Sequence, residues 1–203
     1  MSTTIRNCKT CRRLGMSVCG REKCAYKRKP YPPGIHGKSY RRGLSEFGTQ
    51  LKDKQRVKFL YGLREQQFKN YIEKAVSQRA VPTGEAITAS LEMRLDNAVY
   101  RLGFAPTRRA ARQMVNHGHI TVGGKRVNIP SYRLKVGDEV AVRRESVGKG
   151  LFLNLPVTIK KYAPPEWLEL DKADFKGKVV SRPPAEDLIK SYNLSSIVEY
   201  YSR

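Results

Sequence analysis

Apolar residues recur with the period of an α-helix through the middle of the chain. Between Arg64 and Gln78 they fall on one helical face: Phe68, Tyr71, Ile72, Ala75 and Val76. A rougher apolar stripe precedes them over residues 51–63, and Pro82 and Gly84 then interrupt the pattern. The spacing therefore predicts helices whose apolar faces build a core.

A pair of helices joined by a tight turn is predicted next. The first helix is predicted from apolar residues at helical spacing and ends at Gly103. These residues are Ile87, Leu91, Leu95, Ala98, Val99 and Leu102. Thr107 is a suitable N-cap for the second, which we expect over residues 108–117 and ended by Gly118. The apolar residues that the second helix turns inward are Ala111, Met114 and Val115.

Strands are predicted after this helical pair. Residues 119–122 have the pattern of a strand, Gly123-Gly124 that of a tight turn, and residues 125–128 that of the returning strand. Residues 136–142 supply a further turn and strand. Helices together with a small antiparallel sheet indicate the α+β class.

The balance of charge points to an anionic partner. Lys and Arg outnumber Asp and Glu by 40 to 18, which gives the 203-residue chain a net charge of +22. Residues 1–60 hold 16 of these cations against 3 acids, and residues 91–145 hold 11 against 5. Nucleic acid is the first candidate partner. An anionic membrane surface is the alternative, but the sequence shows no strongly amphipathic helix with a basic face and a large apolar face.

What the sequence lacks disfavours several other classes. No apolar run of about 18 residues is present, which excludes a membrane-spanning helix, and the N-terminus lacks the apolar core of a secretory signal. We therefore expect a cytosolic protein. Neither a Gly-rich phosphate loop, nor paired carboxylates in a cleft-like setting, nor a Ser/His/Asp constellation is recognisable, so we expect no enzymatic activity.

All four cysteines lie in the first 24 residues, as Cys8, Cys11, Cys19 and Cys24. A cytosolic chain keeps its thiols reduced, so two close pairs favour one tetrahedral metal site over disulfides. The segment has almost no apolar residues of its own, so a metal would supply its folding energy. We predict one structural Zn²⁺ on the four thiolates. An iron–sulfur cluster is the alternative, because the spacing does not separate the two.

A basic arm follows the cysteines. Residues 27–37 hold so many prolines and glycines that we expect an extended arm or turn, without helix or sheet. Cations interleaved with aromatic rings suit RNA, through phosphate pairing and base stacking. The candidate RNA contacts in and near the arm are Arg12, Arg13, Lys27, Arg28, Lys29, Tyr31, His36, Lys38, Arg41 and Arg42, to which we add Lys52, Lys54 and Arg56.

The second helix of the pair carries cations opposite its apolar stripe. Arg108 and Arg112 are four residues apart and share a face near the helix N-terminus, where anions are favoured. Replacing each with Ala should therefore cost little stability, within about half a kcal/mol. The alternative is that they pair with Glu92 and Asp96. The candidate RNA contacts in this region are Arg94, Arg101, Arg108, Arg109, Arg112, Gln113, His117, His119 and Lys125.

Longer motifs add a family resemblance. Residues 94–104 have the sequence RLDNAVYRLGF, and residues 107–124 run from Thr-Arg to HITVGG. Residues 31–37 (YPPGIHG), residues 44–51 (LSEFGTQL) and the tail 186–203 continue the pattern. Across essentially its whole length the chain resembles the bacterial ribosomal protein S-four family, and its cysteine segment resembles that of the metal-bearing members.

The resemblance implies a division into three parts. Residues 1–45 would form a four-cysteine metal knuckle with the basic arm, and residues 46–90 with 184–203 a helical domain. Residues 91–183 would form a small α+β RNA-binding domain, in which a helix-turn-helix-like pair lies on an antiparallel sheet. Residues 146–157 match no motif, and we assign no site residue there.

The resemblance also implies a function. The family binds small-subunit (16S) ribosomal RNA directly and helps nucleate assembly of the subunit body. It contacts ribosomal protein S-five, where the contact affects translational accuracy, and it lies near the site where mRNA enters. We therefore expect a cytoplasmic constituent of the small ribosomal subunit, not a stand-alone homo-oligomer. The alternatives are a free RNA-binding regulator and an accessory part of an RNA-modifying enzyme.

Overall fold

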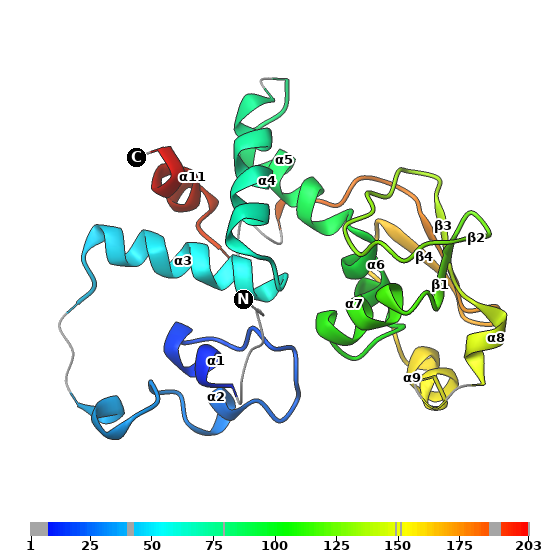
Figure 1. Cartoon of the computed structure of the whole chain (residues 1–203), viewed down its shortest axis with the longest axis horizontal. Coiled ribbons are helices and arrows are strands. Elements are labelled where there is room, and N and C mark those ends of the chain that lie inside the picture. Colours follow the sequence, from blue (N-terminus) through cyan, green and yellow to red (C-terminus); the bar gives the residue numbers. More distant parts are fainter. Residues whose placement is uncertain are drawn as a thin grey trace. The chain divides into compact units, whose positions relative to one another are not determined.

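The computed structural model of the chain describes residues 8–39, 43–78, 80–148, 150, 152–186 and 192–202. The chain forms two compact units, one of Met1–Ile87 with Ala185–Arg203 and one of Thr88–Pro184 (Figure 1). Helix α5 (Thr83–Glu92) runs from the first unit into the second. Within the described ranges, no helix is both long enough and apolar enough to cross a membrane.

The first unit is helical in its described parts. Its helices are α1 (Lys9–Leu14), α2 (Ala25–Arg28), the short 3-10 helix η1 (Ile35–Lys38), α3 (Glu46–Leu60), α4 (Glu65–Ser77) and α11 (Leu194–Ser202). Helix α3 begins after Ser45, whose hydroxyl oxygen accepts a hydrogen bond from the Gly48 amide. It packs against α11, with the rings of Phe47 and Tyr200 5.5 Å apart between centroids.

The second unit combines helices with an antiparallel sheet. The sheet has the strand order β2-β1-β3-β5-β4, made of β1 (Ile120–Val122), β2 (Lys125–Arg126), β3 (Glu139–Val142), β4 (Leu168–Asp171) and β5 (Lys176–Val179). Its helices include α6 (Leu95–Arg101), α7 (Arg108–Asn116), α8 (Arg144–Val147) and α9 (Leu155–Lys160). The prediction of the α+β class is confirmed.

One apolar core joins the helical pair α6–α7 to the sheet. Val99 and Met114 from the helices are buried with Ile120 and Val140 from the strands. Gly177 on β5 makes room for this packing, because a Cβ there would overlap the Leu102 side chain. The sheet thereby fixes α6, which carries the polar side chains described below.

The single helix predicted up to Gly103 is wrong, because the chain breaks between α5 and α6. Arg94 is extended (φ −74°, ψ 139°), and its backbone forms an isolated bridge with Arg133. The Leu134 amide donates to the Met93 carbonyl at 2.9 Å. Residues on both sides of the break are buried, so their apolar periodicity continues across it and resembles that of one helix.

Several other predicted elements are confirmed. Helix α4 corresponds to the predicted helix between residues 64 and 78. Helix α7 begins after Thr107, whose hydroxyl oxygen accepts from the Ala110 amide, and Gly118 follows its end with φ 70°. Strands β1 and β2 form the predicted hairpin, and β3 lies within residues 136–142.

Candidate nucleic-acid interface and metal centre

The four cysteines converge at the start of the first unit. Cys8 precedes α1, Cys11 lies in it, Cys24 is the N-cap of α2, and Cys19 lies on the intervening loop. Their four sulfur atoms lie within 4.8 Å of one another. Cys8, Cys11 and Cys24 are buried, and Cys19 is half-buried. This arrangement can hold one tetrahedral metal ion with four thiolate ligands.

The cysteine segment has more apolar packing than its sequence suggests. Leu14 and Val18 are 5% and 4% exposed and are buried with the cysteines, and Phe59 of α3 packs against the same cluster. The expectation that this segment lacks a core is therefore wrong. Part of its apolar contact comes from a helix that lies some forty residues away in the sequence.

The cysteine thiols differ in acidity. Burial raises the pKa of Cys11 to about 12. Burial also acts on Cys24, but hydrogen bonds involving Ser17, the Tyr26 backbone and Cys19 outweigh it and lower the pKa of Cys24 to about 7. Metal coordination requires thiolates, so binding of a metal would release protons from this cluster.

Arg12 of α1 holds the basic arm. Its Nε donates to the Tyr31 carbonyl (2.9 Å) and its Nη2 to the Pro32 carbonyl (3.1 Å), and its guanidinium group lies 4.7 Å from the Tyr31 ring centroid. Gly37 lies so close to the Pro32 carbonyl that a Cβ would clash with it. This compact turn contains η1, so the expectation of an arm without helix is wrong. The chain closes a short helical turn because Gly37 can approach the preceding backbone.

The other predicted contacts of the first unit differ in exposure. The exposed ones are Arg13, Lys27, Arg28, Lys29, His36 and Lys38. Lys52 is half-buried, and Lys54 is only 4% exposed and donates to Glu65 at 2.6 Å. Arg56 donates to Asp53 and to the Leu14 carbonyl. Arg41 and Arg42 lie outside the described residues.

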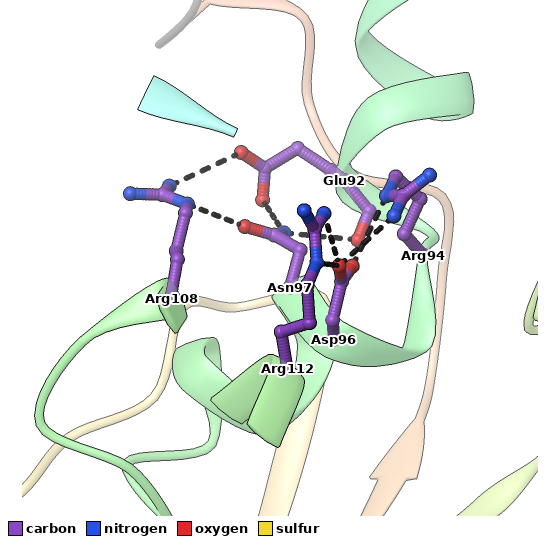
Figure 2. Close-up of polar contacts among 6 residues, drawn as sticks. All are labelled: Glu92, Arg94, Asp96, Asn97, Arg108 and Arg112. Carbon is purple, nitrogen blue, oxygen red and sulfur yellow. Dashed lines mark hydrogen bonds and ion pairs between the residues drawn. The ribbon is translucent and has the colours of Figure 1, made fainter. Parts of the chain in front are cut away.

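In the second unit, Asp96 binds two arginines (Figure 2). Arg94 donates to its two carboxylate oxygens at 3.0 and 2.9 Å. From α7, Arg112 donates to Asp96 Oδ2 through Nε at 2.9 Å and through Nη2 at 2.6 Å. Arg94 is 3% exposed, so the structure does not bring this predicted contact to the surface.

Glu92 and Asn97 accept hydrogen bonds from two further arginines, Arg101 and Arg108. Arg101 donates to both carboxylate oxygens of Glu92, at 2.9 and 2.8 Å. The Asn97 amide donates to Glu92 Oε2 (2.7 Å), and its oxygen accepts from Arg108 Nε (2.8 Å) (Figure 2). Arg108 also lies over the ring of Tyr100, 4.5 Å from its centroid. Two cations are thus held by one buried acid and one buried amide.

These contacts correct the stability expected for the arginines of α7. The pairing with Glu92 and Asp96, considered above as the alternative, is present. Removing Arg112 would take one partner from an Asp96 side chain that is 6% exposed, so we expect a cost of about 1–3 kcal/mol in place of half a kcal/mol. The sequence did not indicate a role for Asn97, because this residue carries no charge and lies beside the apolar stripe, where a polar residue is usually exposed to solvent.

The remaining predicted contacts of this unit lie near the ends of α7 and on β2. Arg109, Gln113, His117 and Lys125 are exposed. His119 is half-buried, with its Nδ1 3.0 Å from the Ser146 hydroxyl. Of the predicted contacts in the second unit, these exposed side chains and the partly exposed Arg101, Arg108 and Arg112 are therefore accessible to an anionic partner.

Comparison with known proteins covers almost the whole chain. The model of the ribosomal protein S4/S9 N-terminal domain matches residues 3–92, and that of the S4 domain matches residues 93–140. Small ribosomal subunit protein uS4 of Chloroflexus aurantiacus is 48% identical over 198 residues, covering 96% of each chain. The uS4 proteins of Caldicellulosiruptor saccharolyticus (45%; 97% of each chain) and Thermus thermophilus (44%; 97% of this chain and 96% of the relative) are similarly close.

The α+β unit with its basic helical pair, the cysteine cluster and the two domain matches define a ribosomal protein that carries an S4 domain. At this identity over nearly the full length of both chains, the chain belongs to the family of small ribosomal subunit protein uS4.

Proposed function

We propose that the chain is a structural constituent of the small ribosomal subunit in the cytoplasm and binds the 16S ribosomal RNA directly. The observation that carries this proposal is its similarity to uS4 proteins along nearly its entire length, including both domains. The net charge of +22 supports contact with a polyanion. The relatives are named as a ribosomal protein, and we propose no catalytic role for this chain.

Two basic surfaces are the proposed RNA contacts. In the first unit they comprise the exposed cations around the arm, together with Tyr31 as a stacking ring. In the second unit they comprise Arg109, Gln113, His117 and Lys125 with the arginines held by Glu92 and Asp96. The buried Arg94 and Lys54 would act through the side chains that they hold.

For the cysteine cluster we propose one structural Zn²⁺, with an iron–sulfur cluster as the alternative. Four thiolates satisfy a tetrahedral zinc ion without an open position for substrate. Metal analysis of the purified protein tests this proposal. About one equivalent of zinc is expected, and an iron–sulfur absorbance band would favour the alternative. Well under one equivalent of zinc without such a band would refute a metal centre.

Among protein partners we propose ribosomal protein S-five, with an effect on translational accuracy, and a position near the site where mRNA enters. These proposals follow from family membership. Reconstitution of small subunits with and without the chain, followed by cross-linking, tests the contacts. Failure to cross-link to either partner in an assembled subunit would remove that proposal.

The ribosomal proposal is tested by RNA binding and sedimentation. The affinity for a 16S ribosomal RNA transcript should fall steeply as salt rises, because bound phosphates release counterions. The chain should also sediment with intact small subunits through sucrose at high salt. A flat salt dependence would contradict the role of the basic surfaces. Loss of the chain from subunits at high salt would favour a free RNA-binding regulator.

A further inference from the structure

The second unit buries two carboxylates beneath the arginines of its basic surface. The side chains of Glu92 and Asp96 are 4% and 6% exposed, whereas those of Arg101, Arg108 and Arg112 are 31%, 17% and 28% exposed. The acids therefore lie inside, and part of each guanidinium group reaches the surface. Burial of two carboxylates costs desolvation that a surface of solvated cations would avoid.

The cluster remains positive despite its acids. Two carboxylates face four guanidinium groups, those of Arg94, Arg101, Arg108 and Arg112. The charge left over is that of two cations, so the acids do not cancel the attraction for phosphate. The acids therefore affect the positions of the arginine side chains more than the net charge of the cluster.

The contacts fix where the guanidinium groups lie. Arg112 and Arg101 are each held by two nitrogen donors on one carboxylate, at distances between 2.6 and 2.9 Å. A free arginine side chain samples many rotamers and loses that freedom when it binds an anion. A side chain already held by a bidentate contact has less to lose, and its planar fork is aligned in advance.

We propose that Glu92 and Asp96 are positioning residues for RNA binding: they hold Arg101, Arg108 and Arg112 in the orientation that contacts backbone phosphates. The inference rests on the proposed function. Asn97 belongs to the same hydrogen-bond network, because its amide donates to Glu92 and accepts from Arg108. The acids touch the arginines and not the RNA.

An effect of net charge alone and a positioning role of Asp96 predict opposite changes in RNA affinity for one substitution. Asp96→Asn keeps the size of the side chain and removes one negative charge. If only net charge mattered, RNA affinity would rise. If Asp96 positions Arg112, the affinity falls although the surface becomes more positive, because the charge-assisted contact is lost.

The experiment measures the affinity of the full-length protein for a 16S ribosomal RNA transcript over a range of salt. Asp96→Asn should bind about tenfold more weakly at fixed salt. Its salt slope should fall by about one unit for each phosphate contact that is lost, which a fraction of unfolded protein would not produce. The control is Glu166→Gln, which removes an exposed acid outside the cluster and should not weaken binding. Equal or tighter binding by Asp96→Asn overturns the inference.

A double-substitution cycle shows whether Asp96 acts through Arg112. In an Arg112→Ala background, Asp96→Asn should change the affinity by less than about twofold, because the side chain that it positions is absent. If the two effects multiply, Asp96 acts by another route and the inference is wrong.

A second variant covers the case in which Asp96→Asn does not fold. Arg112→Lys keeps the charge and loses the planar fork, so it should bind at least about fivefold more weakly. Unchanged affinity would overturn the inference. Failure of the proposed function itself looks different, since then the wild-type chain would not bind the transcript at all.

Discussion

At the scale of single residues, the Asn97 side chain in the Glu92–Asp96 cluster is held by hydrogen bonds at both its nitrogen and its oxygen. Its amide nitrogen donates to the backbone carbonyl and to Oε2 of Glu92, which turns its oxygen toward Arg108. The amide is 1% exposed, so no solvent can replace either contact. An amide serves here because it donates on one side and accepts on the other.

Asn97→Asp should therefore destabilise the second unit by about 2–3 kcal/mol at pH 7. The new carboxylate would face Glu92 at the position of a former donor, and this repulsion raises the pKa of the pair. The folded variant then binds more protons than the unfolded one, so it should regain stability as pH falls toward about 5. Urea unfolding followed by fluorescence of Trp167, which is buried in this unit, measures both effects. A midpoint unchanged from wild type would contradict this account.

At the scale of elements, the fit of α6 on the sheet depends on Gly177. A Cβ on this residue would overlap Leu102, the residue that follows the end of α6. Gly177→Ala should lower the free energy of unfolding of the second unit by about 1–3 kcal/mol. Gly148→Ala is the matched control, because its Cβ would meet nothing within 4 Å and its φ is −82°. Equal unfolding midpoints for the two variants in urea would show that the close approach is unimportant.

Glu65 of α4 connects three helices of the first unit. It accepts hydrogen bonds from Lys54 (2.6 Å) and Lys58 (2.7 Å) of α3 and from the Tyr201 hydroxyl (2.7 Å) of α11. Burial acts to raise its pKa, but these hydrogen bonds outweigh burial and lower the pKa of Glu65 to about 2. The ionised carboxylate therefore stabilises the packing of α11.

Glu65→Gln should lower the free energy of unfolding of the first unit by about 1 kcal/mol at pH 7, since the carboxylate is partly exposed and screened by solvent. Because the folded pKa is depressed, this stabilisation is present above pH 4.5 and is lost as pH falls toward 2. The difference between wild type and variant should shrink over that window in thermal melts followed by circular dichroism. Glu73→Gln removes an exposed pair with Lys69 and should have little effect. A difference that is constant down to pH 2 would contradict the assigned role.

The elements that the sequence predicts well are those whose local signals agree with the fold. Thr107 and Gly118 mark the two ends of α7, and the Gly123-Gly124 turn marks the hairpin of β1 and β2. Strand β5 was not predicted, because its sequence Lys-Gly-Lys-Val lacks a strand pattern and it forms through pairing with β3 and β4. The break at Arg94 also depends on a distant strand-like partner, Arg133.

The residues of the candidate site likewise include some that have a local sequence signal and others whose surroundings depend on the folded structure. The cysteine spacing located a cluster that the structure brings together, and the cations of the arm and α7 were visible as charge. The sequence could not show that Lys54 is buried, because it pairs with Glu65 of another helix. It could not show that Arg94 is buried either, because Arg94 lies at the break between α5 and α6, where it bridges to Arg133. The spacing of four cysteines does not distinguish a zinc site from an iron–sulfur cluster.

At the scale of the whole molecule, each unit has its own source of stability. The cysteine cluster and its small core belong to the first unit, whereas the core around Val99 and Met114 belongs to the second. Damage to one source should therefore leave the other unit folded.

Cys19→Ser should loosen the cysteine segment and the arm while the second unit keeps its structure, because three ligands bind a metal more weakly than four. Limited proteolysis should cut within the first forty residues faster than in wild type. Trp167 fluorescence and its urea midpoint should not change. Glu22→Gln, which changes an exposed side chain between Cys19 and Cys24 and removes no thiolate, is the control. Loss of the Trp167 signal in the Cys19 variant would show that the units are not independent.

The contact between α3 and α11 has a consequence for how the chain is made. Gln50 donates a hydrogen bond to Glu199, 149 positions later, and the complete second unit lies between them in the sequence. A ribosome translating this chain releases residues 88–184 before α11 emerges. The second unit can therefore complete its fold before α11 is available, whereas the earlier-made α3 has to wait for α11 before its packing is complete.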